Sequence, residues 1–98
     1  MKQPERTTHE FSVLFKELGE HADGRSYYED ELDDELQQLG LGEVTGGGTW
    51  LDGRGCDMQI EVSDPVAGLR VIREVLRRLN APVSTRIKSQ AGEFRLEE

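Results

Sequence analysis

The sequence predicts an α+β domain with a four-stranded antiparallel sheet and two helices on one of its faces, in the chain order β-α-β-β-α-β. Apolar and polar residues alternate with the period of a half-buried strand around residues 11–15, 58–62 and 83–87. Two segments between them carry apolar residues at helical spacing, and an Asp-Gly pair at residues 52–53 predicts a hairpin turn. With 98 residues, the chain has the length of one small domain.

The first strand is expected within Thr8–Leu18, and the first helix follows it. Ser26 and Glu29 form a capping box, which predicts that this helix begins near Tyr27. Its apolar residues at helical spacing are Tyr28, Leu32, Leu36 and Leu39. Gly40 is expected to end the helix.

A triple glycine, Gly46-Gly47-Gly48, separates two short strand-like runs, Gly42–Thr45 and Thr49–Leu51. Glycine inside a strand weakens pairing and permits unusual backbone angles, so we expect a bulge or a wide turn here. The Asp52-Gly53 turn then leads into the strand Met58–Val62, which completes a hairpin.

Residues at both ends mark the second helix. Asp64 is expected to cap its N-terminus with Pro65 at the first helical position, and Asn80-Ala81-Pro82 is expected to stop it. Its apolar side consists of Leu69, Ile72, Val75, Leu76 and Leu79. A last strand follows, and residues 90–98 form a polar tail whose apolar residues are Phe94 and Leu96.

This order of elements resembles the ferredoxin-like fold over residues 8–89, which we expect to be the folded core between flexible ends at 1–7 and 90–98. One sheet face would lie under the helices and the other would meet solvent or a partner. The residues expected on the covered face are Phe11, Val13, Phe15, Met58, Ile60, Val62, Val83, Thr85 and Ile87. Those expected on the open face are Ser12, Leu14, Lys16, Asp57, Gln59, Glu61, Arg86 and Lys88.

The formal net charge of −8 argues against nucleic acid or an anionic membrane as a partner, because both bind clustered Lys and Arg. Most of the acidity lies in residues 1–40, which hold eleven Asp or Glu and four Lys or Arg. No apolar run approaches the roughly 18 residues that span a bilayer. The first residues also lack the apolar stretch of a signal peptide, so we expect a cytoplasmic protein.

Few residues offer catalytic or metal-binding chemistry. His9 and His21 have no His or Cys partner at ligand spacing, and the single Cys56 cannot form an internal disulfide. Cys56 as a nucleophile assisted by His9, or phosphate held by the triple glycine, are alternatives to structural roles for these residues. We therefore predict no catalytic residue, no metal ion and no cofactor.

Six carboxylates crowd the first predicted helix: Glu29, Asp30, Glu31, Asp33, Asp34 and Glu35. The helix dipole accounts for two or three of them near the N-terminus, and the rest repel one another at i,i+4 positions. The spacing does not match a calcium-binding loop. A solvated helix face and a surface for a basic partner are the two interpretations that remain.

The second predicted helix is basic on its outer side, where it carries Arg70, Arg73, Arg77 and Arg78. Exposed ion pairs with the first helix are expected, each worth under about 1 kcal/mol. RNA binding through these arginines is not expected, because the open sheet face lacks the aromatic residues on which RNA-recognition modules stack bases.

We predict a non-enzymatic acidic module that binds a basic protein, with Tyr27 or Trp50 as an apolar anchor. The residues expected to contact this partner are Tyr27, Glu29, Asp30, Asp33, Asp34 and Trp50. The stretch Gly42–Gly48, with the following strand and the helix opened by Asp64-Pro65, resembles small bacterial ferredoxin-like proteins, some of them immunity proteins. This resemblance covers about half of the chain, specifies no active site and bears on the fold more than on the function. The expectation that the protein blocks a basic partner such as a nuclease toxin rests on its size, its acidic charge and its lack of catalytic motifs. The alternative is a small ferredoxin-like enzyme or ligand-binding protein, or a homodimer formed through the open sheet face.

Overall fold

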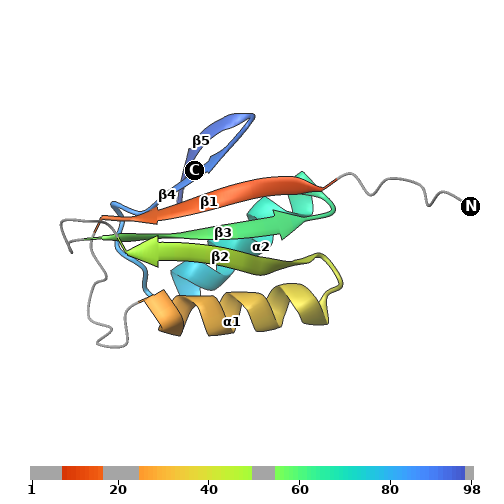
Figure 1. The fold of residues 1–98 in the computed structure, drawn as a ribbon, viewed down its shortest axis with the longest axis horizontal. Helices are drawn as coiled ribbons and strands as arrows, with labels where there is room; N and C mark the ends of the chain where they lie inside the picture. The colour runs from red at the N-terminus through yellow and green to blue at the C-terminus, as the bar shows by residue number, and fades with distance from the viewer. Residues whose placement is uncertain (1–7, 17–24, 50–54, 97–98) are drawn as a thin grey trace, which may run out of the picture.

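A computed structural model describes residues 8–16, 25–49 and 55–96 of the chain (Figure 1). Its elements are β1 (His9–Phe15), α1 (Arg25–Gln38), β2 (Gly42–Thr49), β3 (Cys56–Val62), α2 (Pro65–Arg78), β4 (Arg86–Ser89) and β5 (Gly92–Arg95). The predicted α+β class, with two helices and an antiparallel sheet, is confirmed. In the part of the chain that the structure describes, neither helix is long and apolar enough to cross a membrane.

The sheet has five strands in the order β2-β3-β1-β4-β5, where the sequence predicts four strands. Each neighbouring pair is antiparallel. The additional strand, β5, lies in the segment predicted to be a polar tail and forms a hairpin with β4. Phe94 faces the helix side because it is paired with the buried Ile87, and Leu96 is only 4% exposed. These two apolar side chains give the segment enough burial to extend the sheet.

One apolar layer between the helices and the sheet forms the core. Both helices contribute to it, so they lie on the same face of the sheet. Its buried residues on the strands are Phe11, Val13, Phe15, Cys56, Met58, Ile60, Val62 and Ile87. Those on the helices and after them are Tyr28, Leu32, Leu36, Ile72, Val75, Leu76, Leu79 and Leu96. The alternation read from β1 and β3 therefore places the correct side chains inside.

The start of β4 differs from the prediction. Val83 is 82% exposed, whereas it was expected to lie on the covered face. The Thr85 N–H donates to the Pro82 carbonyl at 3.0 Å, which closes a turn over Val83 and Ser84 and delays the strand to Arg86. Thr85 itself is fully buried, as expected.

Helix α1 begins earlier than its sequence suggests and ends where predicted. It starts at Arg25, so Ser26 lies inside the helix and the predicted capping role is wrong. At the other end, Gly40 adopts a φ of 67°, and the Leu41 N–H donates to the Leu36 carbonyl at 3.0 Å. This is the Schellman arrangement, which satisfies the last helical carbonyls and favours glycine.

Helix α2 has the predicted N-cap. The Asp64 carboxylate accepts hydrogen bonds from the backbone N–H groups of Val66 and Ala67, at 2.9 and 3.2 Å, and Pro65 follows the cap directly. Its end repeats the geometry of α1, with Asn80 at a φ of 60° in place of glycine.

The triple glycine lies within β2, which continues to Thr49 instead of being interrupted. A bulge occurs one residue earlier, between Val44 and Gly46, where the register with β3 shifts. A Cβ atom at Gly47 would overlap the backbone carbonyl oxygen of Asp57, so glycine permits the close approach of β2 to β3. The Asp52-Gly53 turn lies outside the described residues.

Gly68 determines how closely α2 approaches the sheet. It is buried, and a Cβ atom there would lie 2.7 Å from Cγ2 and 2.9 Å from Cβ of Val62. Val62 is 1% exposed and β-branched, so it cannot move aside. The glycine is thus required by packing, although alanine is the better helix former.

We expect Gly68→Ala to lower the free energy of unfolding by about 1–3 kcal/mol, the usual cost of overpacking a core. Urea denaturation measures this change. In a Val62→Ala background the same substitution should cost about 1 kcal/mol less, because the opposing methyl groups are gone. Equal costs in the two backgrounds would contradict the proposed contact.

Candidate functional site

Helix α1 presents a continuous acidic stripe to solvent. Tyr28, Leu32 and Leu36 are fully buried at four-residue intervals, and this spacing fixes which side of the helix faces the core. Asp30, Glu31 and Asp34 are exposed on the side turned away from it. Glu29 is half-buried beside them. The surface expected from sequence is therefore present, with Asp30, Glu31 and Asp34 as its outermost charges.

Asp33 has a structural role that the sequence does not indicate. It is half-buried, and its carboxylate accepts hydrogen bonds from the Val44 backbone N–H at 2.9 Å and from Gln37 Nε2 at 2.8 Å. The first of these bonds joins α1 to β2 across eleven residues of chain. Asp33 thus holds the helix against the edge strand, which reduces its availability to a partner.

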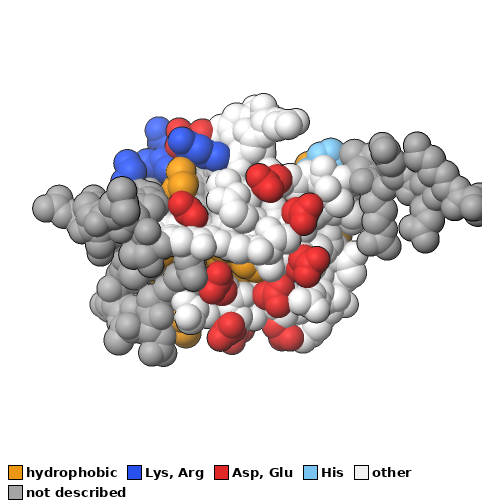
Figure 2. All heavy atoms as spheres, in the orientation of Figure 1, with side chains coloured by type: hydrophobic (Ala, Val, Ile, Leu, Met, Phe, Trp, Pro, Cys, Tyr) orange, Lys and Arg blue, Asp and Glu red, His pale blue; other side chains and the backbone are white. Residues whose placement is uncertain are grey.

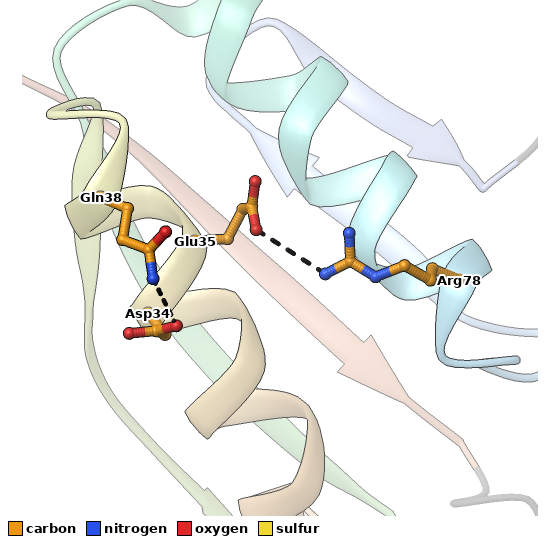
Figure 3. A network of polar contacts seen from close by, with 4 residues as sticks. All are labelled: Asp34, Glu35, Gln38 and Arg78. Carbon is orange, nitrogen blue, oxygen red and sulfur yellow. Dashed lines mark hydrogen bonds and ion pairs between the residues drawn. The ribbon is translucent and has the colours of Figure 1, made fainter.

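Two further polar contacts order the outer side of α1 (Figure 3). Gln38 Nε2 donates to the Asp34 carboxylate at 2.8 Å, one helical turn away. Arg78 of α2 approaches Glu35 at 3.8 Å, and both side chains remain well exposed. This is the ion pair between helices that the sequence predicts, and water screens it strongly.

Three glutamates form a row across the open face of the sheet. Glu10 of β1 lies directly opposite Glu61 of β3, and Glu61 lies opposite Glu43 of β2. Side chains in such positions are about 5 Å apart at their Cβ atoms, and like charges there destabilise the sheet. The Thr8 hydroxyl donates to Glu61 at 3.4 Å. Sequence reasoning places Glu61 on the open face but does not select Glu10 or Glu43, because their alignment depends on strand register.

The stripe on α1 and the glutamate row lie on neighbouring parts of the molecule. Helix α1 packs beside β2, the edge strand that carries Glu43. Figure 2 shows acidic side chains over α1 and over the adjacent strands in a single view. We call the six residues together the acidic surface: Asp30, Glu31, Asp34, Glu10, Glu43 and Glu61.

Of the two predicted apolar anchors, Tyr27 is half-buried at one end of the acidic stripe. Its ring meets the Tyr28 ring edge-on at a centroid distance of 5.4 Å, and Tyr28 stacks on Phe15 at 4.8 Å. Burial raises the pKa of Tyr28, and neighbouring Tyr27 and Cys56 raise it further. The stacked rings of Tyr28 and Phe15 therefore form an uncharged base against which the Tyr27 ring packs at the surface. Trp50 lies outside the described residues.

The residues considered for catalysis do not converge. His9 pairs with Val62 and Cys56 pairs with Phe15, at opposite ends of the β1–β3 ladder, so their backbones are about 20 Å apart. Cys56 is 2% exposed. Residues 46–48 pair with 57–59 inside β2, so among the described residues these glycines lie in a strand and not at the N-terminus of a helix, where an anion would bind.

Within residues 8–16, 25–49 and 55–96, no group of three or more His, Cys, Asp or Glu side chains is arranged to hold a metal ion. The glutamate row places like charges directly opposite one another on adjacent strands. His21 lies outside the described residues.

No protein-family model, curated protein or solved structure matches this chain. None of these comparisons supports the expected likeness to bacterial immunity proteins. Evidence for function comes from the chemistry of the surface described above.

Asp33 and Asp34 provide a matched pair for testing which carboxylates support the fold. Asp33→Ala should destabilise the protein by about 1–3 kcal/mol, because it leaves the half-buried Val44 N–H without an acceptor. Asp34→Ala should change stability by a few tenths of a kcal/mol, since its partner Gln38 is exposed. Urea denaturation of both variants makes the comparison.

Asp33→Asn serves as a second control, because its amide oxygen can still accept the Val44 hydrogen bond. It should retain most of the stability that Asp33→Ala loses. If both Asp33 variants behave like Asp34→Ala, the bond to β2 has no structural importance.

Proposed function

We propose that this chain is a non-enzymatic binding protein whose acidic surface recognises a basic partner protein. The observation that supports this most directly is the glutamate row, in which each side chain has another glutamate directly opposite. Together with Asp30, Glu31 and Asp34, it presents six carboxylates on adjoining elements.

Mutual repulsion gives this surface a preference for cationic contacts. Like-charged pairs across a sheet or at i,i+4 on a helix each cost a few tenths of a kcal/mol. A partner that places Lys or Arg over these carboxylates would replace repulsion by attraction. The same field would also accelerate association through electrostatic steering.

Tyr27 would supply the apolar part of the contact. Its ring is supported by Tyr28 and lies beside the acidic stripe, the arrangement of an aromatic anchor surrounded by charge. Asp33 and Glu35 contribute less to this role, because each already has a partner within the protein.

The proposal extends to the class of protein. The order of the first four strands in the sheet, β2-β3-β1-β4, supports a ferredoxin-like arrangement with β5 as an additional edge strand. With the sequence resemblance noted above, this supports a cytoplasmic bacterial immunity or inhibitor protein that covers the cationic site of a toxin such as a nuclease.

Self-association through the open sheet face is the second candidate. Arg86, Lys88 and Arg95 alternate with the helix-facing residues of β4 and β5, and Glu93 lies opposite Lys88 on the same face. With three cations and one carboxylate, this end of the open face is net basic, whereas the other end carries the glutamate row. Two copies related by a two-fold axis could therefore pair opposite charges. Sedimentation equilibrium over a range of concentrations distinguishes the two candidates, because a homodimer forms without any added partner.

The proposed function is tested by reversing three outer charges of α1. The variant Asp30→Lys, Glu31→Lys, Asp34→Lys should fold, because all three residues are exposed, but should bind a basic partner at least tenfold more weakly. The native protein is used as bait in a lysate of the source cells at low and high salt. Retained proteins are identified by mass spectrometry, and their affinity for both forms is then measured.

The matched control is the variant Asp30→Asn, Glu31→Gln, Asp34→Asn, which removes the charge while keeping side-chain size. It should show intermediate affinity and a weaker dependence on salt. Retention of the same proteins by all three forms, or of proteins that are not basic, would refute the assignment.

A further inference from the structure

A groove of about 780 Å³ runs between α2 and the β4–β5 hairpin on the helix side of the sheet. Its apolar lining includes Phe11, Leu69 and Phe94, and the exposed Val66 lies along one wall. Because β4 and β5 extend the sheet past α2, no third helix covers the inner face of β5 within the described residues. The groove is the space that such a helix would occupy.

Three arginines of α2 line the groove: Arg70, Arg73 and Arg77. Nε of Arg73 donates to the Arg95 carbonyl and Nε of Arg77 donates to the Leu96 carbonyl, each at 2.9 Å. The Arg73 guanidinium also lies over the Phe94 ring, at 5.7 Å from its centroid. These contacts fix two of the three cations along the groove wall before any ligand arrives.

The local charge is opposite in sign to that of the whole protein. Glu74 is the one carboxylate among the described lining residues, while the chain as a whole carries −8. At physiological ionic strength, charges more than about 8 Å apart are largely screened, so the arginines determine which ligands the groove attracts. Charge complementarity therefore favours an anionic occupant with an apolar side.

The length of the groove indicates the shape of that occupant. Its lining on α2 extends from Pro65 to Arg77, which corresponds to about 18 Å along the helix axis. A small-molecule site usually encloses most of its ligand, whereas this groove is only partly enclosed and follows one side of a helix. A helix of about 12 residues lying beside α2 matches these dimensions.

We infer that this groove binds an acidic amphipathic helix of a partner protein. Its apolar side would rest on Val66, Leu69 and Phe94, and its carboxylates would meet the three arginines. A second copy of the chain does not fit this description through α1, its acidic helix, because Tyr28, Leu32 and Leu36 are fully buried. The inference concerns a different surface from the acidic one and does not depend on the proposed function.

A displayed library of random 14-residue peptides, selected on the full-length protein, tests the inference. The selected peptides should carry Asp or Glu together with apolar residues at i, i+3, i+4 and i+7, and should gain helical circular dichroism on binding. Affinities of the selected peptides for the protein and its variants are then measured by fluorescence anisotropy.

Two variants of α2 make the matched comparison, since each reverses one exposed arginine. Arg70→Glu, within the groove, should weaken peptide binding at least tenfold. Arg78→Glu, directed toward α1, should change it less than twofold. Val66→Asp tests the wall of the groove. It should fold, because Val66 is 70% exposed, and it should weaken peptide binding, because it places a negative charge in the groove.

Selection of no acidic amphipathic peptide, or of acidic peptides whose affinity falls equally in Arg70→Glu and Arg78→Glu, would overturn the inference. Basic peptides selected at the acidic surface are recognised because their affinity does not change in Arg70→Glu. A fatty acid also combines a carboxylate with an apolar chain, so it could occupy the groove in place of a peptide. Titration with dodecanoate tests this possibility. Stoichiometric binding of dodecanoate that is lost in Arg70→Glu, without any groove-dependent peptide, would show a lipid site and would also overturn it.

Discussion

The structure depends on a single apolar layer between two helices and one face of the sheet. Phe11, Val13 and Phe15 of β1 lie at its centre, since β1 is hydrogen-bonded to both β3 and β4. In a chain with 35% apolar residues, this layer uses most of the large side chains, so the other sheet face stays polar. The glutamate row and the basic end of the sheet both lie on this open face because the large apolar side chains are taken up by the covered face.

The same layer explains why the arginines and the carboxylates behave differently. Arg73 and Arg77 hold the backbone that follows the last core strands, and Arg78 reaches across to α1. Asp30 and Glu31, by contrast, have no cation within ion-pair distance among the described residues. Several arginines thus make contacts within the protein, whereas the outer carboxylates of α1 are directed to solvent.

Local signals in the sequence predicted local structure well. Gly40 ends α1 and Asp64 with Pro65 opens α2, because helix ends are determined by the residues at those positions. Alternation in β1 and β3 also identified the buried face, because both strands are covered along their length. The α+β class and the buried side chains of these two strands could therefore be predicted without any knowledge of contacts between distant residues.

The features that sequence analysis missed depend on contacts between distant residues. Strand β5 forms because Phe94 and Leu96 reach a core that begins more than 80 residues earlier, and nothing in a polar tail signals that contact. The bond from Asp33 to Val44 joins elements whose relative placement is set by the core. Glu10, Glu43 and Glu61 become neighbours through register. Because the bulge in β2 shifts that register, even a correct list of strands would not have aligned all three.

The two proposed surfaces should respond differently to salt, for a reason that follows from their composition. The acidic surface gains its attraction from exposed charges, which are screened beyond about 8 Å at physiological ionic strength. The groove combines fixed cations with Val66, Leu69 and Phe94, and burial of apolar area is not weakened by salt. A partner held by the acidic surface would accordingly dissociate as ionic strength rises, whereas one in the groove would keep the apolar part of its affinity. The two surfaces are distinct because β5 adds apolar surface on the covered side of the sheet, at the edge farthest from β2, the strand that carries Glu43.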